Sequence, residues 1–218
     1  MRYFLTEDSE QVVGEFWRSL FRALQIDVTV ICSNGNKNMT SVLEKNLDEL
    51  LTAEAVWVQY DIRDDRLVDE RYRNTCQFLL NLARLNSGIQ RLEILCFEDL
   101  LLSFAYLLDW CCCGDAEKRK LAEHIRSCLA QDVYYDDGSD LLMKVKKQYH
   151  PRNPEKLAKA LYRYFTVKTP FEKTLQCYYK DCCYEDFDAP RCAPDSKTGE
   201  DKLRTLYQHS EMQRLMKI

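Results

Sequence analysis

The chain has 218 residues, of which 46% are hydrophobic, with only 6 Gly and 5 Pro. This composition fits one large globular domain, or a domain with an appendage, and excludes a disordered chain. No apolar run is long enough to span a membrane, and an acid follows the opening apolar residues too soon for a signal peptide. We therefore expect a cytoplasmic protein.

The net charge of −4 is unevenly distributed along the chain. Residues 144–173 hold 9 Lys or Arg against 2 Asp or Glu, whereas residues 1–143 hold 15 against 25. This asymmetry predicts a basic patch that contacts a polyanion, or else the solvated face of a helix. The eleven Cys, an odd number without a signal peptide, argue against a disulfide framework.

Predicted strands and helices alternate through the first part of the chain. Runs rich in Val, Ile, Leu and aromatic residues predict strands at 3–6, 27–32, 55–60 and 90–96. Apolar residues at helical spacing predict helices over about 9–24, 38–51, 67–85, 100–110 and 117–130. We therefore expect an α/β fold with a mainly parallel four-stranded sheet flanked by helices. Residues 1–150 form this domain, and residues 151–218 a mostly helical or irregular extension packed on it.

Acidic residues follow three of the predicted strands at their carboxyl ends. Glu7 follows the first strand, Asp61, Asp64 and Asp65 follow the third, and Glu98 follows the fourth. In a parallel sheet these ends lie on the same edge, where ligands bind. A carboxylate cluster at such an edge predicts a site for Mg²⁺ or Mn²⁺, ions that position phosphate oxygens and activate water for hydrolysis.

Each acid also has a purely structural interpretation. Glu7 and Glu98 are typical of the charged first turn of a helix. The segment Asp61–Asp65 is also typical of an acidic surface loop, with Arg63 and Arg66 as ion-pair partners. The occurrence of acids at the same topological position in three units favours the metal site.

The order strand–Glu, strand–Gly turn, strand–Asp-x-x-Asp resembles the Toprim fold, which topoisomerases, primases and the overcoming-lysogenization-defect (OLD) nucleases share. The Glu in LTEDSE is Glu7, the Gly turn is SNGNKN, and the acidic pair is Asp61 with Asp64 or Asp65. The segment LEILCFEDLLLSFAYLLDW is similar to a stretch of RloB-like, defence-associated Toprim proteins. In two places the chain departs from the family: Asp8 follows Glu7 where Gly is usual, and the acidic pair is spaced D-x-x-D rather than D-x-D.

This resemblance implies a metal-dependent endonuclease that hydrolyses DNA or tRNA as the effector of a bacterial anti-phage defence system. It also implies an ATPase protein partner that restrains the nuclease, and it is compatible with an oligomer. The alternative is a catalytically inactive Toprim-like interaction module within a protein complex.

The resemblance further implies which residues act. The metal ligands are Glu7, Asp61, Asp64 and Glu98, with Asp65 as a substitute ligand. Lysines beyond the helix that carries Glu98 lie near the scissile phosphate in the family, and here the candidates are Lys144, Lys146 and Lys147. A Lys at that position stabilises the negative charge that develops on the phosphate.

Three further patterns carry weaker signals. Arg119 and His124 have the spacing of a HEPN ribonuclease motif, but they lie on an ordinary amphipathic helix. Four cysteines with aromatic neighbours predict either a structural zinc site or a plain core: Cys177, Cys182, Cys183 and Cys192. Tyr162 and Phe165 recur at helical spacing and are predicted to lie in the core.

Overall fold

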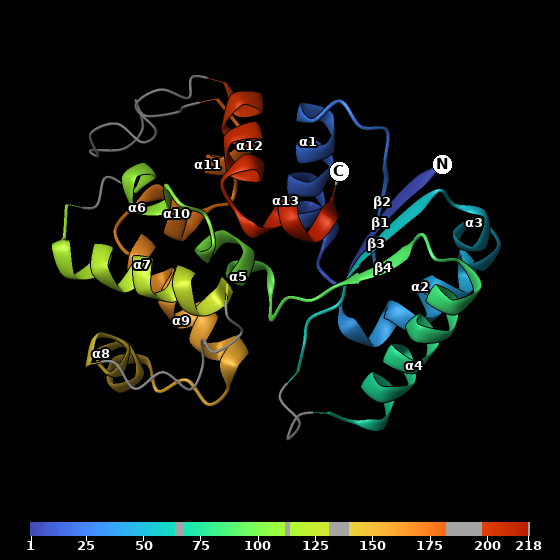
Figure 1. The fold of residues 1–218 in the computed structure, drawn as a ribbon, viewed down its shortest axis with the longest axis horizontal. Helices are drawn as coiled ribbons and strands as arrows, with labels where there is room; N and C mark the ends of the chain where they lie inside the picture. Colours follow the sequence, from blue (N-terminus) through green and yellow to red (C-terminus); the bar gives the residue numbers. More distant parts are fainter. Residues whose placement is uncertain (64–67, 112–113, 131–139, 182–197, 218) are drawn as a thin grey trace. The chain divides into compact units, whose positions relative to one another are not determined.

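The computed structural model describes residues 1–63, 68–111, 114–130, 140–181 and 198–217. These residues divide into two compact units, Met1–Ile94 (unit 1) and Leu95–Ile218 (unit 2) (Figure 1). The α/β fold class predicted from the sequence is confirmed, because unit 1 contains a four-stranded parallel sheet flanked by helices and the described part of unit 2 is helical. Within the described ranges, no helix combines the length and the apolar character that crossing a membrane requires.

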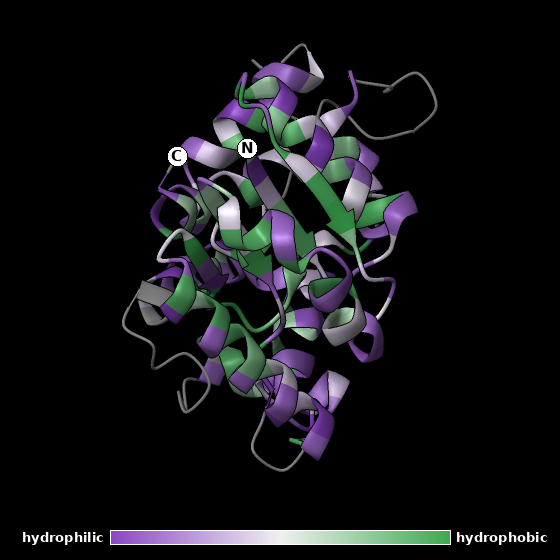
Figure 2. Cartoon of the chain, turned by 90° about the vertical axis from the view of Figure 1, so that its right-hand side faces the viewer, coloured by the Kyte–Doolittle hydropathy of each residue, from purple (hydrophilic) through white to green (hydrophobic). Residues whose placement is uncertain are grey.

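The sheet of unit 1 consists of β1 (Arg2–Thr6), β2 (Thr29–Cys32), β3 (Ala55–Gln59) and β4 (Ile89–Leu92). Their spatial order is β2-β1-β3-β4 and all neighbours are parallel, so the first strand of the chain lies inside the sheet. Leu5 pairs with Ile31 on one side and with Val58 on the other. The strands are apolar along most of their length (Figure 2), as expected of parallel strands covered on both faces.

Helices cover both faces of this sheet (Figure 1). They are η1 (Glu10–Gly14), α1 (Glu15–Ala23), η2 (Asn36–Asn38), α2 (Met39–Lys45), α3 (Leu47–Thr52) and α4 (Glu70–Leu85). α1 packs on one face, where the ring centroids of Phe4 and Trp17 are 4.2 Å apart. α2, α3 and α4 pack on the opposite face against alternate strand residues such as Tyr3, Leu5 and Val56. The alternation along β1 thus assigns successive side chains to different helix layers.

The strand order creates a point from which the connections leave in opposite directions. β1 continues through α1 to β2 on one side, whereas β3 continues through α4 to β4 on the other. β1 and β3 are nevertheless neighbours in the sheet. Their carboxyl ends therefore form the switch point, the place where doubly wound sheets bind ligands.

The fourth strand is shorter than the strand predicted from the sequence. β4 ends at Leu92, because the N–H of Ile94 turns back to the carbonyl of Leu92 (3.1 Å), and the carbonyl of Ile94 accepts a hydrogen bond from the N–H of Ile62 (2.9 Å). Glu98 comes six residues after Leu92, in a helix of unit 2. The prediction that Glu98 directly follows this strand is therefore wrong.

The described helices of unit 2 are α5 (Phe97–Leu102), α6 (Leu107–Trp110), α7 (Ala116–Ala130), α8 (Asp140–Tyr149), α9 (Pro154–Thr166), α10 (Pro170–Lys173), α11 (Gln176–Tyr179), α12 (Gly199–Gln208) and α13 (Glu211–Met216). Asn153 caps α9 by accepting a hydrogen bond from the N–H of Lys156 (2.8 Å). Tyr162 and Phe165 of α9 are buried, which confirms their prediction as core residues.

α9 packs against α5, so the first helix after the sheet belongs to the core of unit 2. For this reason the boundary between the two compact units lies between residues 94 and 95.

The single helix predicted over residues 100–110 is two helices, α5 and α6. The hydroxyl of Ser103 donates to the carbonyl of Leu100 (2.6 Å) as α5 ends. The N–H of Ala105 then donates to the carbonyl of His209 (2.9 Å) instead of to a helix carbonyl. A partner more than a hundred residues away therefore ends the helix, which no local pattern reveals.

Asp99, in the first turn of α5, is a carboxylate in an apolar setting. It is 9% exposed, and its Oδ1 atom accepts no hydrogen bond from the described residues. Burial raises the pKa of Asp99 to about 6; the N–H of Leu95, which donates to Oδ2 (3.3 Å), opposes the rise, and the carboxylates of Glu211 and Glu98 add to it. The folded state therefore favours the neutral form.

We predict that Asp99→Asn raises the free energy of unfolding by about 1–3 kcal/mol at about pH 8, because the amide avoids burying a charge. Below about pH 4 the carboxyl group is protonated in both the folded and the unfolded state, so the advantage disappears. As pH rises through the folded pKa of about 6, the wild type alone loses stability. Urea unfolding across this range tests the prediction, with Glu123→Gln on the exposed side of α7 as the charge-matched control. A difference that does not vary with pH contradicts it.

Candidate metal centre

Glu7 directly follows β1, and hydrogen bonds hold its backbone on both sides. Its N–H donates to the carbonyl of Gln59 (3.2 Å), and its carbonyl accepts a hydrogen bond from the N–H of Gly35 (2.6 Å). Gly35 has a φ of 120°, a conformation that favours glycine, so the predicted turn after the second strand does reach this edge. Glu7 is half-buried, and its Oε2 atom is shielded from solvent.

Asp61 is the second residue after β3, and its backbone is equally constrained. Its carbonyl accepts hydrogen bonds from the hydroxyl of Tyr72 (3.1 Å) and from Nη2 of Arg91 (3.0 Å). Arg91 Nη2 also donates to the carbonyl of Tyr60 (2.7 Å). Asp61 is half-buried, and its Oδ1 atom is shielded from solvent. β1 and β3 therefore each bring one acid with a shielded carboxylate oxygen to the switch point.

Tyr60, the residue before Asp61, is a buried tyrosine directly after β3. Tyr60 is 1% exposed, and burial raises its pKa; the hydrogen bond with Thr75 and the charge of Arg63 oppose the rise. The carboxylate of Glu7 contributes to the rise as well. The negative charge of Glu7 therefore affects a side chain at the end of β3.

A buried network lies behind the two acids, on the α1 face of the sheet. Oε1 of Gln59 accepts a hydrogen bond from Trp17 Nε1 (2.9 Å) and another from the hydroxyl of Thr6 (3.1 Å). Nε2 of Gln59 donates to Oδ2 of Asp8 (2.7 Å). Thr6, Trp17 and Gln59 are fully buried, so the network fixes the carboxylate of Asp8 beside the switch point.

Asp8 is thus a third half-buried acid at this edge, and the sequence pattern did not mark it as a site residue. The sequence signal for Asp8 was its position directly after Glu7. In the comparison with the Toprim family, however, Asp8 was noted only because it replaces the usual glycine. Its partner Gln59 is far along the chain and is held by the pairing of β3 with β1. Sequence spacing alone does not show that the two side chains meet.

Cys32 ends β2 at the same edge but is not a thiolate. Burial raises the pKa of its thiol to about 12, and the neighbouring carboxylate of Glu10 adds to the rise. A protonated thiol is a poor metal ligand. Among the described residues, Glu7, Asp8 and Asp61 offer carboxylate oxygens at this edge, the kind of donor that hard cations such as Mg²⁺ and Mn²⁺ prefer.

The described residues contain no group of three or more His, Cys, Asp or Glu side chains arranged to hold a metal ion. Asp64 and Asp65, two of the predicted ligands, lie outside the described residues. Within the described ranges, Glu7 and Asp61 are the predicted ligands that the fold brings to neighbouring strand ends. Carboxylate oxygens are ligands that Mg²⁺ and Mn²⁺ prefer.

Glu98 has a different environment from the one predicted. It is half-buried in the first turn of α5 in unit 2. Burial alone lowers the pKa of Lys159 on α9, but the carboxylates of Glu155 (2.8 Å from the Lys159 ammonium) and Glu98 hold that pKa above its ordinary value. Glu98 therefore contributes to the charge balance between α5 and α9.

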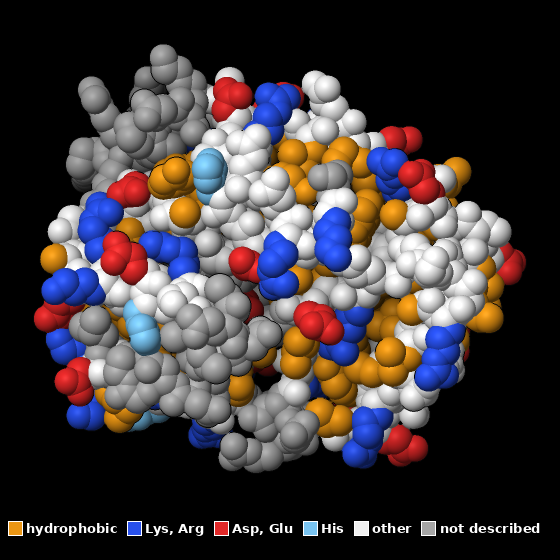
Figure 3. All heavy atoms as spheres, in the orientation of Figure 1, with side chains coloured by type: hydrophobic (Ala, Val, Ile, Leu, Met, Phe, Trp, Pro, Cys, Tyr) orange, Lys and Arg blue, Asp and Glu red, His pale blue; other side chains and the backbone are white. Residues whose placement is uncertain are grey.

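The three candidate lysines lie on α8 of unit 2. Lys144 pairs with Glu117 (2.7 Å), Lys146 is half-buried, and Lys147 is exposed. On the face shown in Figure 3, the cations of unit 2 are interspersed with acids and do not form one continuous patch. Ion pairs thus neutralise part of the positive charge of the 144–173 segment.

The remaining patterns have mixed outcomes. Arg119 pairs with Asp109 (2.6 Å), and His124 is half-buried on α7, as in an ordinary amphipathic helix. Cys177 is buried in α11. The other three cysteines of the candidate zinc pattern lie outside the described residues: Cys182, Cys183 and Cys192.

The fold and this edge define unit 1 as a doubly wound α/β unit with acidic residues at its switch point. No protein-family model, no curated protein and no solved structure matches the chain. The resemblance to Toprim proteins therefore rests on the residues quoted from the sequence.

We predict that Gln59→Met lowers the free energy of unfolding by about 2–4 kcal/mol, because it leaves the buried donors of Trp17 and Thr6 without their shared acceptor. Urea unfolding of the variant and the wild type measures the loss. Gln77→Met on the exposed side of α4 is the matched control and should change stability by less than about 0.5 kcal/mol. Equal stabilities of the two variants would contradict the network.

Proposed function

We propose that the protein is a metal-dependent nuclease whose unit 1 binds Mg²⁺ or Mn²⁺ at the carboxyl ends of β1 and β3. The observation that carries this proposal is the pair Glu7 and Asp61, which follow adjacent parallel strands at the switch point. Each acid has one carboxylate oxygen shielded from solvent. In the proposed site, oxygens of these two carboxylates are the first ligands of the divalent cation.

The two acids hold the cation, and the hydrogen bonds around them hold the acids. Glu7 is positioned by backbone bonds to Gln59 and Gly35, and Asp61 by Tyr72 and Arg91. When bound, the cation polarises a phosphate oxygen and lowers the pKa of a water molecule. These hydrogen bonds fix the backbone from which the two carboxylates project.

In this proposal the remaining predicted residues have secondary roles. Lys147 is exposed on α8 and suits a contact with the nucleic-acid backbone, as does Lys146, whereas Lys144 already pairs with Glu117. Asp64 or Asp65 is assigned to complete the ligand set. The choice between DNA and tRNA, the role in anti-phage defence and the regulating ATPase partner rest on the Toprim resemblance.

A second candidate is a non-catalytic interaction module with the same fold. Two features favour it: Asp8 replaces the usual glycine after Glu7, and Asp61 and Asp64 are spaced differently from the family pair. Such a module keeps the sheet but has no affinity for divalent cations.

We predict that Glu7→Gln and Asp61→Asn each reduce metal-dependent cleavage about 100-fold or more, because each removes a charged ligand of the cation. Plasmid DNA and total tRNA, incubated with Mn²⁺ or Mg²⁺, are the substrates. Asp48→Asn, which removes an exposed acid from α3 of the same unit, is the control and should retain cleavage.

The outcomes separate the two candidates. Full cleavage by Glu7→Gln or Asp61→Asn would show that the metal-site assignment is wrong. If the wild type does not cleave, calorimetric titration with Mn²⁺ decides: binding that both variants lose supports the metal centre, and no binding by the wild type favours the interaction module. Circular dichroism of each variant verifies that it is folded.

A further inference from the structure

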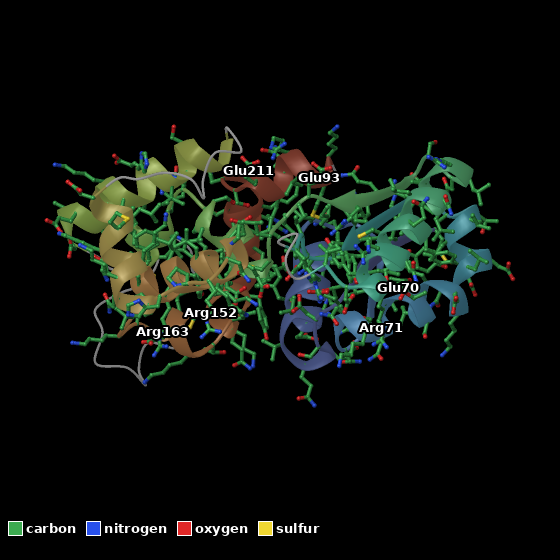
Figure 4. The ribbon with its side chains drawn as sticks, turned by 90° about the horizontal axis from the view of Figure 1, so that it is seen from below. Glu70, Arg71, Glu93, Arg152, Arg163 and Glu211 are labelled. Carbon is green, nitrogen blue, oxygen red and sulfur yellow. The ribbon has the colours of Figure 1, made fainter. Side chains whose placement is uncertain are left out.

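A polar hollow lies in unit 1 between the start of α2 and the start of α4. Its volume is about 980 Å³, and its walls are formed by the segments 37–41 and 69–74. Glu70 and Arg71 mark the α4 side, at the first turn of that helix (Figure 4). The volume is at the upper end of the range for small-molecule sites, so it accommodates a nucleotide.

The hollow lies on the same edge of the sheet as the proposed metal centre. α2 follows β2 and α4 follows β3, so both helices begin at the carboxyl edge. The hydroxyls of Thr40 and Thr75 join the two helices (2.7 Å). Thr75 is also close enough to Tyr60, the residue before Asp61, to oppose the rise in its pKa. The wall of the hollow is therefore close to the end of β3.

The charges around the hollow favour a ligand that is anionic at one end. Lys37 and Arg71 are exposed and form no ion pair with the described residues, so both cations can meet an anion. The carboxylate of Asp69 is engaged at the N-cap of α4, where it accepts a hydrogen bond from the N–H of Tyr72 (2.7 Å). Glu70 is exposed and offers acceptor oxygens.

The rest of the lining offers hydrogen bonds rather than stacking. Asn74 of α4 and Ser41 of α2 contribute an amide and a hydroxyl, and the lining residues include no aromatic side chain. Amides and carboxylates pair with the edges of nucleobases, whereas a base that is bound by stacking needs an aromatic platform. This lining therefore suits a base that is held by its edge.

We infer that the hollow seats one nucleotide of a single-stranded nucleic acid, with its phosphate on Lys37 and Arg71 and its base edge on Asn74 and Glu70. This inference rests on the proposed nuclease function, since it places that nucleotide next to the one whose phosphate reaches Glu7 and Asp61. A free phosphate would contact only Lys37 and Arg71 and would leave the amide of Asn74 and the carboxylate of Glu70 without a ligand. A nucleotide within a strand contacts the cations with its phosphate and the other two groups with its base.

Binding of a fluorescein-labelled single-stranded oligonucleotide, measured by fluorescence anisotropy in EDTA, tests the inference without metal. Lys37→Gln and Arg71→Gln are each expected to weaken binding about 3- to 10-fold. Each is also expected to make the logarithmic salt dependence of binding shallower, by about 0.7 for every phosphate that the variant no longer neutralises. The matched controls are Lys45→Gln and Arg84→Gln, which remove one charge from the opposite ends of α2 and α4. The controls are expected to bind within about twofold of the wild type.

Three results would overturn the inference: no binding by the wild type, equal losses in the test and control variants, or displacement of the oligonucleotide by inorganic phosphate as readily as by an unlabelled strand. Asn74→Ala tests the base contact, because it should weaken the preference among homopolymers without changing the salt slope. The metal centre is tested separately by cleavage with Asp61→Asn. Loss of cleavage there, together with unaltered oligonucleotide binding in Lys37→Gln and Arg71→Gln, would retain the nuclease and reject the nucleotide seat.

Discussion

The parallel pairing of β1 with β3 is the constraint on which the rest of unit 1 depends. Its register sets Thr6 opposite Gln59, so both strands end in a buried polar residue and the two side chains bond to each other. The acids follow within two residues of these strand ends. A register shift of one residue would turn Gln59 toward the opposite face, away from Trp17, and would leave a buried amide among apolar side chains.

Two polar side chains on opposite faces of the sheet stabilise the same edge. Gln59 acts on the α1 face through its hydrogen bonds to Trp17 and Asp8. Arg91 acts on the α4 face, where its guanidinium lies over the Tyr60 ring (5.3 Å to the centroid) and donates to the backbone after β3. Polar groups removed from water lower stability unless they are bonded; here Gln59 also binds the carboxylate of Asp8, and Arg91 the backbone of Asp61. The stability of the sheet and the geometry of the candidate site therefore have the same origin.

The parts of the fold that could be predicted are those encoded locally. Val, Ile and Trp in short runs predicted the strands, and apolar spacing predicted α4 and α9, because burial of a strand or a helix face leaves a period in the sequence. The positions that failed are those where backbone hydrogen bonds end an element while the apolar pattern continues. β4 ends early because the N–H of Ile94 turns back to the carbonyl of Leu92, and α5 ends where Ala105 bonds to His209. Glu98 was misplaced for this reason, whereas Glu7 and Asp61, which follow the central strands, lie at the edge where they were predicted.

The central place of β1 also has a consequence for how the chain folds. β1 is complete at Thr6, but its two neighbours in the sheet end only at Cys32 and Gln59. During synthesis, both edges of the apolar strand β1 therefore stay unpaired until β2 and β3 have been made. The pairings of β1 with these strands are long-range and slow to form. Any delay in translation before Gln59 prolongs the time during which both edges of β1 are unpaired and open to pairing with another chain.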